Sequence, residues 1–454
     1  MISTSLLLSG LGIIALLFGI LVTLLIWNKP VLVIYIQLAY CCFMRLLITQ
    51  FKFPVFIKYL SDYLTIILLV QIILGFSKAK TLNIRKPFIF IILFAVAAIV
   101  STMYNNSGFI FFVWGARSYF RFFIFFLACT IFLKQENIDK MIKYLFILLP
   151  INTVMALFQY FILGLRDDFV GGLFGIVKGC NAEMYLYLSV VTLITIVFYV
   201  NYKISILRFL FNVLMVVLIA AISELKIVFF VLPIIVLIIF IMSFPNRRAF
   251  LMVNISIALV AVSLLFFLLL YPDWLKDFEN FNMLLDHTVM DKYAGEGSLG
   301  RLTAGPFLIR NILSGTSNKL FGVGFGNAST FLHFISEFYN RYEVLSYDLF
   351  SYSLLLFEVG LIGLITYCLF FVAVLFESIR IKMKIGKKHA AYSTVSFIAS
   401  TMVFQLLIYN QSMYMDCAFI IFFALSFPFI LEKDTYEERI PAESGILAEA
   451  NRGI

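Results

Sequence analysis

The chain has 454 residues, of which 63% are hydrophobic and 13% are charged, and its formal net charge is +9. Soluble globular domains are closer to half apolar and about a quarter charged, so the composition excludes an ordinary soluble domain. Apolar runs of about 20 residues recur along the chain, each long enough to cross a bilayer core of about 30 Å as a helix. The alternating segments typical of an outer-membrane barrel are missing from the sequence. The sequence therefore predicts an all-α polytopic membrane protein.

Taken in chain order, the apolar runs predict about 12 to 14 transmembrane helices. The second run is the weakest because Arg45 interrupts it. The expected spans are roughly residues 5–27, 31–50, 60–77, 87–103, 109–133, 141–163, 182–200, 205–221, 225–243, 249–271, 350–377, 391–410 and 414–431.

The distribution of cations between alternate loops predicts the orientation. One set of short loops, which begins with Lys29, carries 17 lysines and arginines, whereas the opposite set carries only Lys52, Lys58, Arg166 and Lys178. Because cytoplasmic loops carry the excess of cations, the first set is expected inside and the polar loops 164–181 and 272–349 outside. Orientation thus accounts for the positive charge, and no nucleic-acid partner is expected.

Four segments follow from this arrangement. Residues 1–271 are expected to form the N-terminal transmembrane helices, 272–349 a large outer loop, 350–431 the C-terminal transmembrane helices, and 432–454 a solvated, disordered cytoplasmic tail. A loop this long is usually functional or disordered. Its aromatic residues are spaced so that they could bury one face, which favours an ordered loop: Trp274, Phe278, Phe281, Phe307, Phe321 and Phe325.

Cysteine and histidine usage gives no metal or disulfide framework. Five of the six cysteines lie in or beside apolar runs, while Cys180 is in a polar loop. The histidines, His287, His333 and His389, are too scattered for a zinc motif. Neither a metal nor a cofactor is expected.

Two arginines stand inside the run "WGARSYFRFF", where charge is costly by about 3 kcal/mol per residue. Arg117 and Arg121 are four residues apart and therefore share one face of a helix. Such a pair favours a bound anion, and a phosphate or pyrophosphate fits the guanidinium fork. The alternative is that both side chains reach the interface or pair with acidic neighbours.

Other ionisable residues carry weaker signals. Glu224 and Lys226 lie at an outward turn, either as a simple ion pair or as part of a site. Glu183 begins an outward-facing span, where it is either hydrated or favourable at a helix N-terminus.

The large loop holds the densest polar set. Arg301 and Arg310 flank Pro306, and the run "GVGFG" with Gly322, Gly324 and Gly326 permits a tight turn or a close backbone approach to a ligand. Asp348 lies at the threshold of the next span and Glu358 deeper within it, either in a site or bonded to a neighbouring helix.

The order of these motifs resembles that of the O-antigen polymerase and O-antigen ligase superfamily of bacterial surface-polysaccharide enzymes. The loop carries "GR" at Gly300 and Arg301, then "LFGVGFG" over 320–326, then "EVGLIG" over 358–363. The "ARSYFRFF" span is also similar, as is the "SELK" turn, with Lys226 where relatives often carry Arg. The resemblance covers about residues 109 to 380. The ligases carry a histidine shortly before the last motif, whereas this chain has Asp348 there, which favours a polymerase.

The resemblance implies a GT-C-like fold and glycosyl transfer at the periplasmic face of the bacterial inner membrane. The donor would be a glycan on undecaprenyl pyrophosphate and the acceptor a sugar hydroxyl of one lipid-linked repeat unit. No D-x-D pair in an outer loop could hold a metal, so cations of the chain would neutralise the leaving pyrophosphate and a carboxylate would take the proton. Membrane lipid and a chain-length regulator protein are further expected partners.

Roles for individual residues follow from the same resemblance. The proposed catalytic residues are Asp348 as base, Arg301 and Glu358. The proposed pyrophosphate ligands are Arg117, Arg121, Lys226 and Arg310, and the weaker substrate contacts are Glu183, Glu224 and Gly324.

Three alternatives remain open. A flippase for the same lipid-linked units would also need cations, but it is expected to have two related halves and no such long loop. An O-antigen ligase would transfer glycan to lipid A core instead. A structural membrane scaffold would have no use for so many intramembrane cations.

Overall fold

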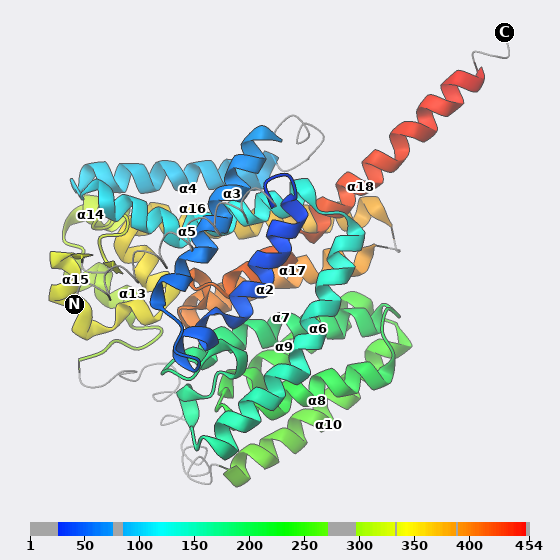
Figure 1. The fold of residues 1–454 in the computed structure, drawn as a ribbon, viewed down its shortest axis with the longest axis horizontal. Coiled ribbons are helices and arrows are strands. Elements are labelled where there is room, and N and C mark those ends of the chain that lie inside the picture. The colour runs from blue at the N-terminus through cyan, green and yellow to red at the C-terminus, as the bar shows by residue number, and fades with distance from the viewer. Residues whose placement is uncertain (1–25, 76–84, 271–296, 332–333, 387–388, 451–454) are drawn as a thin grey trace, which may run out of the picture.

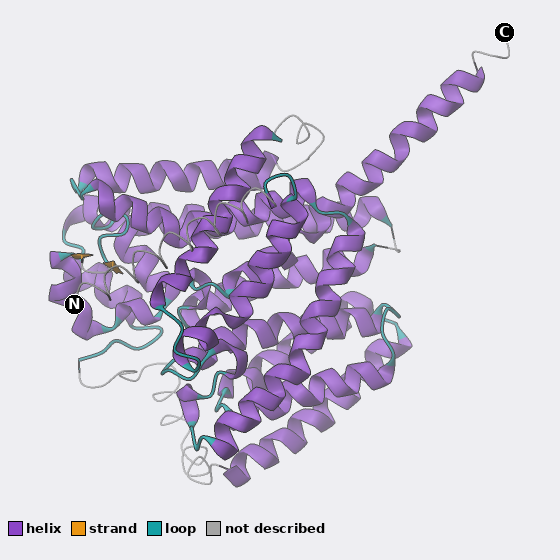
Figure 2. Cartoon of the chain, viewed as in Figure 1, coloured by secondary structure: helices purple, strands orange, loops and turns teal. Residues whose placement is uncertain are grey.

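The computed structural model describes residues 26–75, 85–270, 297–331, 334–386 and 389–450. Most of the described residues are helical, loops connect the helices, and the strands form one short hairpin (Figure 2). The helices of the N-terminal part are α2 (Pro30–Thr49), α3 (Leu60–Leu74), α4 (Arg85–Tyr104), α5 (Phe109–Phe132), α6 (Gln135–Leu157), α7 (Cys180–Val200), α8 (Ile206–Ile222), α9 (Lys226–Ser243) and α10 (Arg247–Leu270).

Short elements then precede three long helices. These are α13 (Ala304–Phe307), α14 (Gly315–Phe321), the antiparallel pair β1 (Thr330–Phe331) and β2 (Phe334–Ile335), and α15 (Glu337–Tyr342). The long helices are α16 (Ser351–Ile385), α17 (Ala390–Tyr409) and α18 (Ala418–Ala450). Single turns complete the chain, among them η1 (Val55–Tyr59), η3 (Phe158–Ile162), η4 (Asp167–Phe169), η5 (Gly172–Phe174), η7 (Leu308–Ile312), η8 (Glu343–Leu345), η9 (Tyr347–Leu349) and η10 (Ser412–Tyr414).

Within the described ranges, 9 helices are long and apolar enough to cross a membrane. The chain is therefore a multi-pass α-helical membrane protein, as its composition predicts. Twelve of the thirteen expected spans coincide with helices, and the first, 5–27, lies outside the described residues. Helix α8, with 17 residues, falls just short of that length criterion.

Local sequence explains where several helices begin. Pro30 occupies the first turn of α2, where its missing N–H costs no hydrogen bond. The Ser205 side chain caps α8 by accepting a hydrogen bond from the Arg208 backbone N–H at 3.4 Å. Gly179 adopts a left-handed conformation (φ 81°) immediately before α7.

Successive long helices run in opposite directions and so define two ends of the bundle. We call the "loop end" the side that carries residues 50–54, 105–108, 163–179, 223–225, 297–350 and 410–417. The opposite side, where α2 and α6 begin, is called the "cationic end". The short elements between α10 and α16 gather at the loop end, and α18 projects beyond the cationic end (Figure 1).

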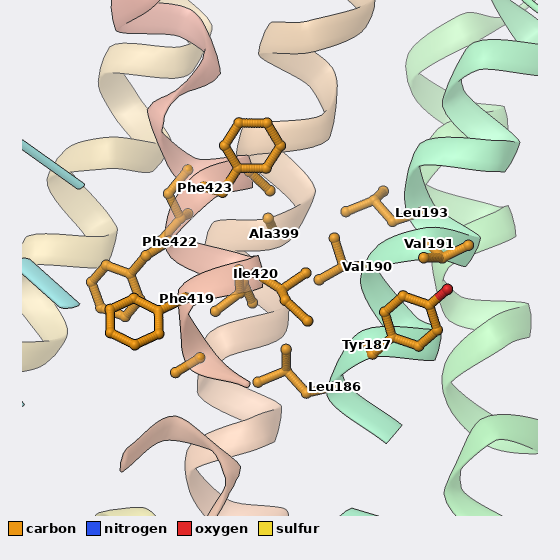
Figure 3. Packing of buried hydrophobic residues seen from close by; sticks show 14 of the residues in the cluster. Leu186, Tyr187, Val190, Val191, Leu193, Ala399, Phe419, Ile420, Phe422 and Phe423 are labelled. Carbon is orange, nitrogen blue, oxygen red and sulfur yellow. The ribbon is translucent and has the colours of Figure 1, made fainter. Parts of the chain in front are cut away.

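Helix α7 lies at the centre of the bundle. The part of α7 that is apolar enough to span a membrane is buried throughout, because helices α6, α8, α9, α17 and α18 surround it. A helix that is apolar on every face requires such an environment. Leu186, Val190 and Leu193 of α7 pack toward Ala399 of α17 and Ile420 of α18 (Figure 3).

One expectation for the polar segments changes, and another holds for the described residues. Helix α18 continues to Ala450, so the described part of the tail after residue 431 is helical, not disordered. In the large loop, residues 297–331 and 334–349 form ordered elements, and Phe325 is fully buried. The expected aromatic residues Trp274, Phe278 and Phe281 lie outside the described residues.

Candidate functional site

A cavity of about 430 Å³ opens within the bundle near the loop end. This volume is in the range of small-molecule sites. Segments far apart in sequence line it: the end of α2, η1, the first turns of α5, the start of α7, the β1 region, η9, α16 and the turn before α18. Its charged lining residues are Arg45, Lys58, Arg117, Arg121, Glu183, Asp348, Glu358 and Asp416. The structure thus brings Arg117, Arg121, Glu183, Asp348 and Glu358 together, as the sequence hypothesis requires.

Helix α5 presents Arg117 and Arg121 on one face, as their spacing predicts, but protein carboxylates occupy the space between them. Arg117 Nε donates to Asp62 Oδ2 at 2.6 Å, and Arg121 NH1 lies 3.7 Å from Asp62 Oδ1. Arg121 NH1 also donates to Asp416 Oδ1 at 2.7 Å. Of the two interpretations of this pair, the structure shows the one with acidic neighbours. The sequence does not indicate Asp62 and Asp416 as partners of these arginines, because they come from α3 and from the turn before α18.

A second ion pair joins Arg45 of α2 to Glu183 in the first turn of α7. Glu183 is buried, so the guanidinium compensates a carboxylate that would otherwise be costly in this environment. Sequence reasoning missed Arg45 as a site residue and treated it only as an interruption of a span. The signal was present, since an ionisable residue inside an apolar run indicates a polar partner or a cavity.

Lys58 is the remaining cation that lines the cavity, and sequence reasoning did not identify it as a site residue either. It packs over the ring of Tyr59 at 5.2 Å, and the Arg117 guanidinium lies between the rings of Tyr59 (5.5 Å) and Trp114 (4.3 Å). None of the described carboxylates forms an ion pair with Lys58. Its ammonium group therefore remains available to an anionic ligand, whereas the three arginines already contact carboxylates.

Asp348 lies in η9 at the cavity wall. Burial raises the pKa of its carboxyl group above the ordinary value, and the nearby charge of Glu343 raises it further. The Tyr414 hydroxyl donates to the Asp348 backbone oxygen at 2.6 Å, which fixes the turn against the segment before α18. No ion pair within the described ranges involves the Asp348 side chain. A carboxyl group of this kind can exchange a proton with a ligand.

Glu358 lies deeper, where α16 is interrupted. Gly360 adopts a left-handed conformation inside the helix (φ 66°, ψ −167°), so the helical hydrogen bonds around it are broken. The Phe357 carbonyl accepts from the Val323 backbone N–H at 2.9 Å. The Glu358 carbonyl accepts from the Gly324 N–H at 3.1 Å and from Ser101 Oγ at 2.8 Å. Irregular backbone at membrane depth needs such replacement partners.

The Glu358 side chain lies in the cavity wall, two residues before this interruption. It is only 1% exposed, and its carboxyl group faces the Gly326 and Ala328 backbone and the Ser329 hydroxyl. Its Oε2 atom has no hydrogen-bond partner among the described groups. The "GVGFG" run therefore forms one wall around Glu358.

The glycines of that run allow close packing of backbone on backbone. A Cβ atom at Gly322 would lie 2.6 Å from the Glu358 carbonyl, and one at Gly360 would lie 2.4 Å from Leu320. A Cβ atom at Gly326 would lie 2.0 Å from the Phe111 carbonyl of α5. The close approach that the sequence predicts is thus made to helices α16 and α5 of the chain itself.

Five candidate residues lie outside the cavity lining. Arg301 donates from Nε to the Tyr409 carbonyl at 3.2 Å, and its guanidinium stacks over the Tyr409 ring at 4.7 Å. Tyr409 comes two residues before Gln411, which lines the cavity. Arg310, in η7, is exposed. Lys226 pairs with Glu224 at 2.6 Å, which matches the simple ion-pair alternative, and burial raises the Glu224 pKa. Gly324 contributes only its backbone to the Glu358 carbonyl.

No group of three or more His, Cys, Asp or Glu side chains in the described parts of the chain is arranged to hold a metal ion. Neither a protein-family model nor a curated protein matches this chain.

Proposed function

We propose that this chain is a membrane glycosyltransferase that joins undecaprenyl-pyrophosphate-linked oligosaccharide repeat units, as an O-antigen polymerase does. The observation that carries the proposal is the polar cavity of about 430 Å³ at the loop end. It combines Lys58, which has no carboxylate partner among the described residues, with the carboxyl groups of Asp348 and Glu358, which have no cation partner there. Charged groups held at such cost inside a membrane protein favour an ionic ligand.

The proposed reaction uses these groups as follows. The acceptor hydroxyl oxygen forms a bond to the anomeric carbon of the donor glycan, and the bond from that carbon to the pyrophosphate oxygen breaks. Asp348 accepts the hydroxyl proton, because burial makes its carboxylate a stronger base than an exposed aspartate. Lys58 and the exposed edge of Arg117 neutralise the charge that develops on the pyrophosphate. Since the chain supplies these cations, the transfer is proposed to be independent of metal.

The orientation in the membrane is part of the proposal. The cationic end carries residues such as Lys134, Lys143, Arg208 and Lys384, whereas the loop end has few cations in its short connections. By the positive-inside rule the cavity faces away from the cytoplasm, toward the periplasm of a bacterial inner membrane. Lipid-linked units that have already crossed the membrane would therefore reach it.

The test is chain growth by the purified full-length protein, reconstituted with synthetic lipid-linked repeat units in the presence of EDTA. The wild type is expected to make long chains, Asp348→Asn none, and Lys58→Ala far fewer. Lys52→Ala is the matched control, because Lys52 is an exposed cation close to Lys58 that does not line the cavity. Transfer that requires a divalent metal, or unchanged chain growth in Asp348→Asn, would contradict the proposed mechanism.

Arg301 offers a separate test of the sequence hypothesis. Its guanidinium lies against Tyr409 beside the cavity, so Arg301→Ala is expected to shorten or abolish the polysaccharide while the protein still inserts. Cells that carry the variant should display single repeat units on their surface. A flippase would instead leave none there, and a ligase variant would leave long chains not joined to lipid A core.

A further inference from the structure

A second cavity, of about 280 Å³, lies at the cationic end, remote from the site described above. Helices α6 and α17 meet there with the turn from α7 into α8. Its polar lining consists of Asp139, Lys143, Lys203, Arg208 and Tyr392. All five residues lie near the ends of these helices, where lipid headgroups are expected beside helices that cross a membrane.

A buried tyrosine holds the central cation of this cavity in place. Lys203 Nζ donates to the Tyr392 hydroxyl at 3.0 Å and lies 4.1 Å from the centre of the Tyr392 ring. The same hydroxyl donates to Asp139 Oδ1 at 2.5 Å. Tyr392 is 0% exposed, which fixes the position of the ammonium group. The Arg208 guanidinium packs over the ring of Phe146, which also lines the cavity, at 5.5 Å.

The charge balance of the cavity favours an anion. Lys143, Lys203 and Arg208 contribute three positive charges, and Asp139, which already accepts a hydrogen bond from the Tyr392 hydroxyl, contributes one negative charge. A guanidinium and ammonium groups converging on one space match the oxygen atoms of a phosphate. Basic pockets between transmembrane helices are a recurrent means of binding lipid phosphates.

Apolar side chains continue from the cavity toward the membrane interior. On α6, Ile147 and Ile151 follow Lys143 at intervals of four residues and are 48% and 45% exposed. On α8, which packs against α6, Phe211 and Leu214 follow Arg208 and are 45% and 49% exposed. An acyl chain can lie along these residues while its phosphate occupies the cavity.

We propose that this cavity binds the phosphate group of an anionic phospholipid. The polar side chains of the cavity suit any phosphate. The exposed apolar side chains of Ile147, Ile151, Phe211 and Leu214 favour a lipid over a free ion as its source. The inference does not depend on the proposed glycosyl transfer, because it concerns other residues at the other end of the bundle.

Native mass spectrometry of the purified full-length protein, titrated with phosphatidylglycerol, tests the proposal. The wild type is expected to retain phosphatidylglycerol in preference to zwitterionic phosphatidylethanolamine. Arg208→Ala is expected to weaken retention about tenfold, the effect of one charge-assisted hydrogen bond. Lys203→Ala/Arg208→Ala should remove the preference. Lys29→Ala/Arg247→Ala is the matched control, since both residues are exposed cations at the same end outside the cavity.

Several outcomes would overturn the proposal. Equal retention of the two lipids by the wild type is one, and unchanged retention in the double variant is another. Displacement of bound lipid by millimolar inorganic phosphate would assign the site to a free phosphate. Arg208 is exposed, so its alanine variant should fold, and an unchanged melting temperature checks this. Chain growth by Arg208→Ala is measured in a separate assay. A failure of the lipid-binding proposal can then be told apart from a failure of the proposed glycosyl transfer.

Discussion

At the scale of single residues, the charged groups near the cavity fall into two kinds. Arg45 with Glu183, and the two arginines of α5 with Asp62 and Asp416, compensate one another. Removing one member of such a pair leaves a buried charge without a partner. Asp348 and Lys58 face the cavity without an ionic partner in the described structure, so the proposal assigns them to ligand binding and not to folding.

Asp348→Asn is expected to abolish transfer and at the same time to stabilise the protein at neutral pH. Burial raises the folded-state pKa of Asp348, so its ionisation opposes folding. The advantage of the asparagine variant should be full above that raised pKa and vanish as the pH falls below about 3.9, the value in the unfolded chain. Thermal unfolding in detergent across this pH range measures the difference. A variant less stable than wild type at pH 7 would contradict this account.

Arg121→Ala is expected to destabilise the protein by about 3 to 5 kcal/mol, because Asp416 then lies buried without its cation. Lys58→Ala, which breaks no ion pair, should change stability by less than about 0.5 kcal/mol. The double variant Arg121→Met/Asp416→Asn should recover part of the loss. Denaturant unfolding of the three proteins checks the order. For the same reason, lost activity in Arg121→Ala alone is ambiguous between catalysis and folding.

At the scale of elements, a break at Gly360 shapes α16. The interruption at Gly360 frees the carbonyls of Phe357 and Glu358, and the glycine-rich run supplies the N–H groups that satisfy them. This exchange holds the Glu358 carboxyl group in the cavity wall. The motifs "GVGFG" and "EVGLIG", which lie about 40 residues apart, therefore form one structural unit. The close packing of each motif requires the glycines of the other.

Gly360→Ala and Gly164→Ala separate backbone strain from close packing. Both glycines have φ 66°, but a Cβ atom at Gly164 meets nothing within 4 Å, whereas one at Gly360 would lie 2.4 Å from Leu320. Gly164→Ala should cost about 1 to 2 kcal/mol from its left-handed conformation alone. Gly360→Ala should cost clearly more and also reduce chain growth. Equal losses of stability in the two variants, measured by thermal unfolding, would refute the interlocked packing.

At the scale of the whole molecule, the two cavities lie at opposite ends of one bundle. The larger one has balanced charges, and residues of the short elements between α10 and α16 contribute to its lining. Those elements gather at the loop end (Figure 1). The smaller one has excess positive charge at the cationic end. This polarity is what the positive-inside rule requires if the first faces the periplasm and the second the cytoplasmic leaflet.

Cysteine labelling tests this orientation. Thr330→Cys, at the exposed edge of the larger cavity, should react with a membrane-impermeant maleimide in intact cells. Lys143→Cys, in the smaller cavity, should react only after the inner membrane is permeabilised. The wild type is the control, since five of its cysteines are buried and Cys368 is partly buried. The reverse labelling pattern would place the larger cavity in the cytoplasm.

The sequence by itself determined the membrane class, nearly all of the helices and the two arginines on one face of α5, because these depend on local hydropathy and helical periodicity. It also singled out five of the residues that line the larger cavity. Only the tertiary structure decided which charges are paired, since Asp62 and Asp416 reach α5 from distant segments. It likewise brought Arg45 and Lys58 into the cavity and left Arg310 and Lys226 outside it. Ion pairing and backbone contact depend on which helices pack side by side, and no local pattern in one sequence records that arrangement.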